Sequence, residues 1–154
     1  MANTFSPRGR YFEEFEIGDV ATSAGRTITE TDVVSFAGLS GDYTQIHTDV
    51  EFCREGMFGQ RVAHGLLILG IASGLLARLG FIEGTALAFR ELTWKFSLPV
   101  FIGDTLHAQA TVTGLKPVRR LGGGMVTFEV QVINQAGKLT QGGAWVVLIA
   151  NRPE

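Results

Sequence analysis

Hydrophobic and polar positions alternate with a period of two through most of the second half of the chain. This alternation predicts strands with one buried face over residues 92–98, 106–112 and 126–132. A continuously apolar run over residues 144–149 predicts a further strand, which should lie centrally in a sheet. Turn-forming residues separate these runs, at Gly103-Asp104, Gly122–Gly124 and Asn134–Gly137. The pattern therefore predicts an antiparallel meander of four strands.

The first third of the chain predicts one strand and one short helix. Residues 20–28 form the strand, and Thr29 follows as an N-cap residue with Asp32 in the capping-box position. Ser40-Gly41 ends the helix that these residues begin. The polar residues 42–61 predict an irregular connection to the next element.

The run over residues 62–79 predicts the central element of the fold. It is apolar nearly all round and is followed by Gly80, which predicts a helix that is buried on most faces. Because no other long helix is available to cover the apolar face of the sheet, the sheet should curl around this one. The sequence thus predicts an α+β fold, with an antiparallel sheet wrapped around one long central helix. The uncovered edge strands of such a sheet predict a homodimer, or a higher assembly of dimers.

The composition predicts one soluble domain over residues 1–154 and excludes several classes of function. The net charge is −2 with no block of basic residues, which argues against a nucleic-acid partner. The longest nonpolar stretch, residues 66–77, is shorter than the roughly 20 residues that span a bilayer, so no membrane partner is expected. The start of the chain has no apolar signal segment. The lone cysteine, Cys53, is expected to be a buried filler and fits a reducing compartment, so we expect a cytoplasmic protein.

Asp42 and His47 are the first candidates for acid/base chemistry. Both side chains can transfer protons, and His exchanges a proton most readily near neutral pH. They are five residues apart and share neither a helical face nor a strand face, so they converge only in an irregular segment. By themselves, an Asp and a His in a loop are more often a helix cap or a solvated surface pair. This alternative stays open from the two residues alone.

His64-Gly65, at the start of the predicted central helix, is the second candidate. Unpaired backbone N–H groups and the positive end of the helix dipole point out of a helix N-terminus. A glycine there lets a ligand carbonyl approach the backbone, and an oxyanion forming at that place would be stabilised. The alternative is that Gly65 only starts the helix and His64 caps or packs. Ser73, two turns further on, is expected to bond back to a backbone carbonyl.

Several of these segments together resemble the MaoC-like dehydratases, and among them the (R)-specific enoyl-CoA hydratases of the hydratase 2 group. The similarity extends from near Phe12 to Ile149, and the order and spacing of its motifs make it specific. The segments that carry it are Phe36–Asp42, Ile46–Asp49, Phe58-Gly59, Val62–Leu66, Phe96–Val100 and Gly103–Leu106.

The resemblance implies a hotdog fold, in which an antiparallel sheet wraps a long helix, with a dimer as the basic unit. It implies that Asp42 and His47 are the catalytic pair, which holds and polarises one water molecule. Gly65 matches the glycine whose backbone N–H binds the thioester carbonyl. Ser73 matches a helix serine that helps to orient the aspartate in some members.

The sequence departs from the family pattern at two places. Thr44-Gln45 stands where the family usually has Asn-Pro, which we expect to affect the range of substrates more than catalysis, because Thr44 keeps a hydroxyl. Leu98 stands where many relatives have Lys or Arg, so a phosphate contact from that position is missing. Other side chains are therefore candidates for substrate contacts: Lys95, Arg61 and Arg90 for phosphate groups, Tyr43, Thr44 and His64 near the acid/base pair, and Ser73 on the central helix.

The function that the resemblance implies is a hydro-lyase that adds water reversibly to a 2-enoyl thioester, giving a 3-hydroxyacyl thioester of the (R) hand. The substrate is an acyl-CoA or acyl-carrier thioester, and coenzyme A enters only as part of it. No separate cofactor or metal is expected, because the His and Cys residues match no metal-ligand spacing.

Three alternatives to this function stay open. A hotdog thioesterase generally has a carboxylate or an Asn on or near the central helix, and the predicted helix here contains no acid. A non-catalytic acyl-binding module is disfavoured by the joint presence of Asp42, His47 and Gly65. A dehydratase for a branched or dicarboxylic acyl-CoA differs only in its substrate.

Overall fold

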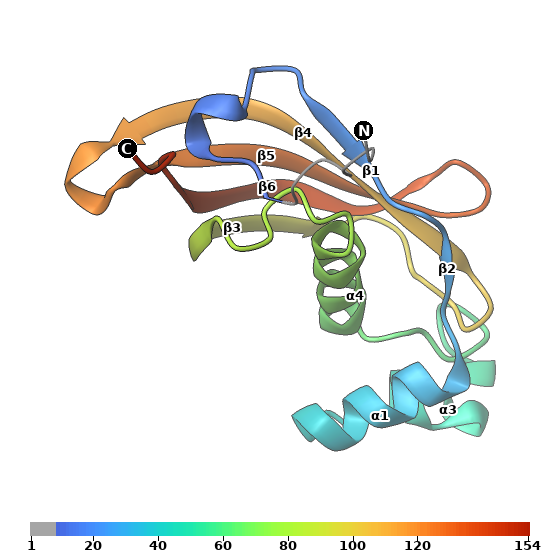
Figure 1. Cartoon of the computed structure of the whole chain (residues 1–154). Helices are drawn as coiled ribbons and strands as arrows, with labels where there is room; N and C mark the ends of the chain where they lie inside the picture. Colours follow the sequence, from blue (N-terminus) through green and yellow to red (C-terminus); the bar gives the residue numbers. More distant parts are fainter. Residues whose placement is uncertain (1–8) are drawn as a thin grey trace, which may run out of the picture.

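A computed structural model describes residues 9–154, in which one antiparallel sheet curves around helix α4 (Gly65–Ala77; Figure 1). The first eight residues, on which part of the expectation about the start of the chain rests, lie outside this range. The strands follow the order β1-β4-β5-β6-β3, and β2 also pairs with β4. Their bounds are Val20–Thr22 for β1, Arg26–Thr27 for β2, Ala86–Phe96 for β3, Thr105–Val118 for β4, Gly123–Ile133 for β5 and Leu139–Ala150 for β6. The predicted α+β class is confirmed.

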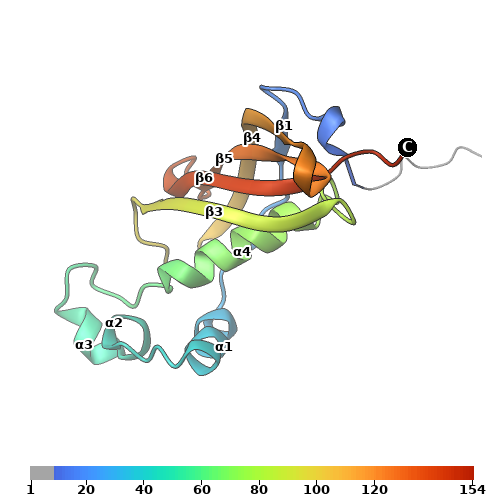
Figure 2. The same cartoon turned by 90° about the vertical axis from the view of Figure 1, so that its left-hand side faces the viewer.

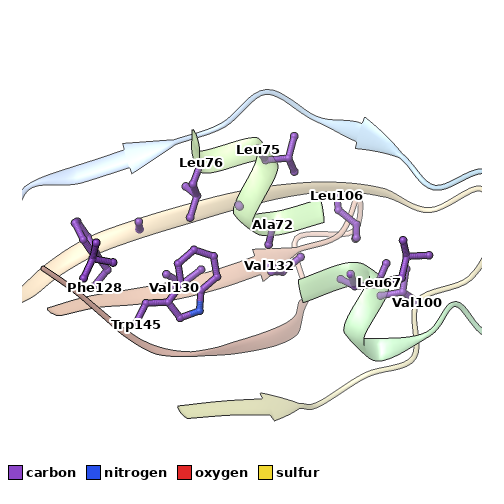
Figure 3. Close-up of a cluster of buried hydrophobic side chains, with 14 of the residues drawn as sticks. Leu67, Ala72, Leu75, Leu76, Val100, Leu106, Phe128, Val130, Val132 and Trp145 are labelled. Carbon is purple, nitrogen blue, oxygen red and sulfur yellow. The ribbon is translucent and has the colours of Figure 1, made fainter. Parts of the chain in front are cut away.

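The hydrophobic core lies between α4 and the face of the sheet that surrounds it. Leu67, Ala72, Leu75 and Leu76 of α4 are buried among side chains from β5 and β6, among them Val130 (Figure 3). Every second residue of β4 and β5 is buried along most of both strands, as the alternation predicts. Each Leu, Val or Phe side chain in this layer contributes about 1.5–3 kcal/mol when it leaves water, so this layer supplies most of the driving force for folding.

Helix α1 (Glu30–Ser40) begins and ends at the residues that the sequence predicts. The Thr29 hydroxyl accepts a hydrogen bond from the Asp32 backbone N–H, and the Asp32 carboxylate accepts one from the Thr29 N–H at 2.8 Å. Gly41 ends the helix in the left-handed conformation, with φ of 78°, which glycine adopts without steric cost. The guanidinium of Arg26 contacts the Asp32 carboxylate at 2.7 Å and thereby ties α1 to β2.

The predicted meander of four consecutive strands is wrong in one respect. Strands β4, β5 and β6 follow one another as predicted, but β3 pairs with β6 instead of β4. The reason lies in the segment between β3 and β4, where Val100 accepts a hydrogen bond from Ala63 and Phe101 forms a bridge with Val62. These contacts hold the connection between β3 and β4 at the start of α4. Strand β4 therefore lies apart from β3, with β5 and β6 between them.

Three other boundaries also differ from the sequence prediction. The helix expected over residues 62–79 begins only at Gly65, because the backbone N–H groups of Val62 and Ala63 bond to Ile46 and Val100. The strand expected over residues 20–28 is split into β1 and β2. The connection expected to be irregular over residues 42–61 contains two short helices, α2 (Gln45–Thr48) and α3 (Val50–Arg54). The remaining elements are the 3-10 turns η1 (Phe12–Glu14) and η2 (Arg119–Leu121).

Two surfaces of the single chain lie open. Strand β3 forms a free edge of the sheet (Figure 2), and most of its residues are exposed. Helix α4 also exposes one face, so the expectation that it is buried on most faces is wrong for one chain. The sheet covers only the opposite face, and the exposed residues are Leu66, Gly70, Ser73, Gly74 and Ala77. Within residues 9–154, no helix is long and apolar enough to cross a membrane.

The close approach of β3 and β6 requires a glycine at position 143. A Cβ there would collide with the backbone carbonyl oxygen of Thr93 on β3. We therefore expect Gly143→Ala to lower the free energy of unfolding by about 1–3 kcal/mol, measured by urea denaturation at fixed protein concentration. Gly38→Ala on α1 is the control, because a Cβ there lies 3.7 Å from the Tyr43 hydroxyl, an ordinary contact distance, and alanine favours a helix. Equal stability of both variants would contradict the prediction.

Candidate active site

Asp42 directly follows the end of helix α1, where the chain turns away at Gly41. Its backbone N–H donates to the Ser40 hydroxyl at 3.1 Å, and Ser40 in turn donates to the Phe36 carbonyl. Asp42 as a whole residue is partly exposed, and its carboxylate belongs to an exposed side chain. The end of the helix therefore fixes the position of Asp42 and leaves its carboxylate accessible.

Thr44 holds the carboxylate of Asp42 through two hydrogen bonds. The Thr44 hydroxyl donates to Oδ1 of Asp42 at 2.5 Å, and the Thr44 backbone N–H donates to the same oxygen at 3.1 Å. These bonds stabilise the ionised form and hold the pKa of Asp42 below its usual value, with smaller contributions from the nearby His47 and His64. Asp42 is therefore a carboxylate at neutral pH and can only accept hydrogen bonds.

His47 lies in α2 and is buried, with 8% of its surface exposed. Its Nδ1 lies 2.7 Å from the carbonyl oxygen of Val62. Because a carbonyl oxygen only accepts, Nδ1 carries the hydrogen, and the neutral ring has its free electron pair on Nε2. His47 is thus arranged to accept a proton through Nε2.

Arg61 keeps α2 in place, and its guanidinium is already engaged by Glu30. Its guanidinium bonds both carboxylate oxygens of Glu30 at the start of α1, at 2.9 and 2.5 Å, and reaches the His47 carbonyl at 3.5 Å. The ion pair lowers the pKa of Glu30 and raises that of Arg61, so both stay charged across the physiological range. Arg61 therefore joins α1 to the His47 segment.

Gly65 is the first residue of α4, and its backbone N–H has no hydrogen-bond acceptor within residues 9–154. A Cβ at this position would lie 2.7 Å from the Phe96 ring, so a larger residue would have to displace that ring. The Gly65 carbonyl accepts from the side-chain amide of Gln141 at 3.2 Å, and Gln141 accepts from the Trp94 indole at 2.9 Å. The free N–H of Gly65 is thus held at a defined place beside His47.

Gln141 is a site residue that the sequence analysis missed. It is a buried polar side chain in β6, with 2% of its surface exposed. The final strand was predicted only from the apolar run at residue 144, so Gln141 fell outside it. A polar residue just before a continuously apolar strand was the available signal.

Asp42, His47 and His64 meet in space, with one oxygen or nitrogen atom of each within 4.8 Å of the others. Two His and one carboxylate are a set that can hold a metal ion. However, the rings of His47 and His64 are stacked, with centroids 3.9 Å apart and planes 26° apart. Electron pairs in nearly parallel ring planes do not point to a common centre. The expected absence of a metal stays a prediction, and this stacking supports it.

The other predicted substrate contacts are scattered. Ser73 donates its hydroxyl to the Gly70 carbonyl at 2.7 Å, as its position in a helix predicts, and lies two turns from Gly65. Tyr43 is exposed beside Asp42, and its backbone carbonyl accepts from the Thr48 hydroxyl. Lys95 and Arg90 are exposed on the edge strand β3. Within the one chain, the structure therefore brings together Asp42, Thr44, His47, His64 and Gly65.

Cys53 is buried and its thiol lies against the backbone carbonyls of Gln45 and Ile46, at 3.5 and 3.4 Å. It packs α3 onto α2. The expectation of a buried filler is confirmed.

Two cavities lie along α4. The first, of about 500 Å³, is at the N-terminal end of the helix and is lined by His47, Gly65, Leu66, Phe96 and Gln141 among others. The second, of about 350 Å³, lies further along the helix and is almost entirely apolar, with Ser73 the exception. Its other lining residues include Leu76, Phe89, Phe128 and Trp145.

Residues 14–134 match the protein family described as the MaoC like domain. The chain belongs to this family. Among curated relatives of this MaoC-like protein, the (R)-specific enoyl-CoA hydratase of Rhodospirillum rubrum is 36% identical over 142 residues, 92% of this chain and 93% of the relative. The 3-hydroxybutyryl-CoA dehydratase of Methylorubrum extorquens is 36% identical over 110 residues, 71% of this chain and 68% of the relative.

Solved structures of similar proteins agree with the MaoC-like fold. A protein of Archaeoglobus fulgidus described as a monoamine oxidase regulatory protein superposes with a TM-score of 0.89 at 37% identity, covering 95% of this chain and 98% of that one. The unliganded R-hydratase PhaJ1 of Pseudomonas aeruginosa gives 0.78 at 29% identity, with 92% and 86% covered. A Mycobacterium tuberculosis protein described as a double hotdog fold gives 0.79 at 22% identity, covering 95% of this chain and 46% of that one, and shows the fold alone. The sheet wrapped around α4 is a hotdog fold.

The hydrogen bonds of Thr44 predict a measurable property of this MaoC-like site. Thr44→Val removes the hydroxyl that bonds Oδ1 of Asp42, so we expect the pKa of Asp42 to rise towards its usual value. Thr44→Ser keeps the hydroxyl and should leave the pKa low. The measurement is a carbon-13 NMR titration of the Asp42 carboxyl group. An unchanged titration of Asp42 in Thr44→Val would contradict the assigned cause.

Proposed function

We propose that this MaoC-like protein adds water reversibly to a 2-enoyl-CoA and forms an (R)-3-hydroxyacyl-CoA. The observation that carries this proposal is that one atom each of the Asp42 carboxylate and the His47 ring lie within 4.8 Å of each other, while His47 and Gly65, with its free N–H, line the same cavity. The names of the relatives, an (R)-specific enoyl-CoA hydratase and a 3-hydroxybutyryl-CoA dehydratase, support the reaction type. The (R) hand rests on those names alone.

In the hydration direction, Asp42 and His47 hold one water molecule. His47 takes a proton from this water through Nε2, because its Nδ1–H is already donated to Val62. The water oxygen forms a bond to Cβ of the substrate, and the electrons of the double bond move towards the thioester oxygen. The N–H of Gly65 stabilises the negative charge that forms there. The pair then returns a proton to Cα, so the net change is the addition of one water.

The substrate enters as a thioester, and no separate cofactor is needed for this reaction. The thioester carbonyl can accept from the Gly65 N–H, for which the structure shows no acceptor within residues 9–154. The apolar cavity beside Ser73 offers an acyl chain a surface without charged groups. Phosphate groups of coenzyme A would need a cation, and Lys95 and Arg90 on β3 are the exposed candidates. We also propose a cytoplasmic location, which the reduced, buried Cys53 supports.

The proposed function predicts hydration of crotonyl-CoA, followed as loss of the absorbance of the conjugated thioester. Asp42→Asn and His47→Gln should each lower kcat by about two to four orders of magnitude, because each removes a group that handles the proton. Asp49→Asn and His107→Gln are matched controls outside the site, since Asn also caps α3, and both should keep normal rates.

Free-thiol release is measured in the same assay. Release of thiol without hydration would instead indicate a thioesterase, although α4 contains no acid within Gly65–Ala77. If acyl-CoAs of several chain lengths give neither hydration nor thiol release, the protein is a non-catalytic acyl-binding protein. Near-normal activity of Asp42→Asn or His47→Gln would contradict the role given to that residue.

We propose further that two copies form a homodimer through β3 and the exposed face of α4. The free edge of β3 offers unpaired backbone groups to a second copy. Large apolar side chains are exposed on and near this edge, among them Leu87, Phe89, Leu92 and Phe96. Such a cluster is unusual on the surface of a monomer and fits a buried interface.

The dimer predicts a sedimentation coefficient above that of a 16.6 kDa chain at micromolar concentration. Leu92→Lys places a charge on the edge strand, so we expect it to shift the protein towards monomer. Leu121→Lys is the control, because Leu121 has a similar exposure but lies in η2, away from β3. Only monomer in the unchanged protein would contradict the proposal.

A further inference from the structure

His64 touches both members of the acid/base pair. Its Nε2 lies 2.9 Å from the backbone carbonyl oxygen of Asp42, and its ring is stacked on the ring of His47 with centroids 3.9 Å apart. The ring of Phe36 packs on it as well, at 4.8 Å. His64 is 2% exposed, so it offers almost no surface to a substrate. These contacts differ from those expected of a substrate-binding residue.

The hydrogen-bond partners fix opposite tautomers in the two stacked rings. The Asp42 carbonyl only accepts, so Nε2 of His64 carries a hydrogen, whereas in His47 the hydrogen is on Nδ1. The Nδ1 of His64 is buried and has no hydrogen-bond partner within residues 9–154. Burying an unpaired ring nitrogen is unfavourable, and an apolar ring could fill the same space without that cost. The bond from Nε2 to Asp42 is therefore the contact that distinguishes a histidine here from a simple packing residue.

The main chain of Asp42 is held on both sides. Its N–H donates to the Ser40 hydroxyl at 3.1 Å, and its carbonyl accepts from His64. Its side chain is exposed, and within residues 9–154 its hydrogen bonds are those from Thr44. An exposed carboxylate keeps a fixed place only if its main chain is fixed, and the bond from His64 provides one of the two anchors.

We propose that His64 is a positioning residue, which sets the separation and orientation of the Asp42 carboxylate and the His47 ring. The proposal rests on the hydratase function proposed above. The Nε2–H of His64 fixes the main chain of Asp42, and its ring fixes the plane of the His47 ring. One buried side chain therefore sets the positions of both residues. Because His64 is the N-cap residue of α4, that geometry is also tied to the helix whose first N–H belongs to Gly65.

The size of the effect follows from the sensitivity of catalysis to distance. A misplacement of a reacting group by about 1 Å can lower a rate by about 10²-fold. Loss of His64 should therefore lower kcat and leave KM nearly unchanged, because His64 does not itself bind the substrate. A residue that bound the substrate would show its effect mainly in KM.

Three variants separate the two contacts of His64. His64→Phe keeps a flat ring against His47 but cannot donate to Asp42. His64→Gln can place an amide N–H near the position of Nε2 but has no ring. His64→Ala loses both contacts. His107→Ala is the control, since His107 lies on β4 away from the site. Circular dichroism and thermal unfolding show which variants are folded.

With crotonyl-CoA, we expect His64→Ala to lower kcat by about 10²-fold or more with KM within about threefold. The kcat values of His64→Phe and His64→Gln should lie between that of His64→Ala and that of the unchanged protein, because each variant keeps one contact. If His64→Ala does not fold, a loss of about tenfold in kcat in each of the other two is the expected result. The proposal would be overturned by a folded His64→Ala whose kcat is within about threefold of normal, or whose defect is only a raised KM. It would also be overturned if the kcat values of His64→Phe and His64→Gln were both as low as that of His64→Ala.

A second measurement needs no substrate. Nitrogen-15 NMR of the neutral imidazoles should show the hydrogen on Nε2 in His64 and on Nδ1 in His47, and single-histidine variants assign the signals. A hydrogen on Nδ1 of His64 would remove its bond to Asp42 and overturn the proposal. If the unchanged protein hydrates no enoyl-CoA but shows opposite tautomers, the proposed function fails while the structural role of His64 stands.

Discussion

Within residues 9–154, α4 is the long helix that packs along the apolar face of the sheet, and this packing determines where the site can be. Its buried side chains, such as Ile68 and Ala72, have to be apolar because they lie between the helix and strands β4 to β6. Within Gly65–Ala77 there is no charged residue, and the candidate acid/base groups lie beyond the N-terminal end of the helix. Figures 1 and 2 show α1, α2 and α3 beyond the N-terminal end of α4, on the side away from the sheet. The acid/base groups thus come from this segment, and the helix supplies the N–H of Gly65.

The site depends on which atoms are already engaged in hydrogen bonds. Thr44 keeps Asp42 ionised, and the Val62 carbonyl takes the Nδ1–H of His47, so the carboxylate and Nε2 are the atoms left for a water molecule. The ion pair between Glu30 and Arg61 holds the surrounding helices together. Its bidentate geometry matters more than its Coulomb energy, because exposed ion pairs contribute only about 0–1 kcal/mol. Each charged group near the site therefore has a structural reason to be where it is.

The sequence predicted the parts of this fold that depend on local patterns. The capping box of Thr29 and the alternation in β4 and β5 need only neighbouring residues, and both are confirmed. The partner of β3 could not be predicted, because its pairing with β6 depends on how residues 97–104 pass the start of α4. The short helices α2 and α3 were missed for a similar reason. They are too short to form alone and depend on contacts such as the bond from Val62 to Ile46.

In the candidate site, too, the features that depend on sequence order could be predicted, and those that depend on tertiary contacts could not. Asp42, His47 and Gly65 could be named from their order and spacing, because the resemblance to a family supplied the tertiary information that spacing lacks. The partners of His64 and Gln141 could not be named in this way. Asp42 and His64 are 22 residues apart, and Gly65 and Gln141 are 76 apart, so only the folded chain brings them together. Sequence reasoning therefore found the candidate acid/base groups and missed the contacts that hold them in place.

The change from Asn-Pro to Thr44-Gln45 can now be understood in physical terms. Gln45 is the first residue of α2, a position where proline fits because its missing N–H has no partner in the helix. Gln45 can occupy the same place and loses only the fixed φ of proline, a change of about 0.4–1 kcal/mol in the free energy of unfolding. Thr44 donates its hydroxyl to Asp42, so the carboxylate keeps a donor. The substitution preserves the ionised aspartate and relaxes the turn. Its effect should therefore appear in how the loop adapts to the acyl group rather than in the proton transfer itself.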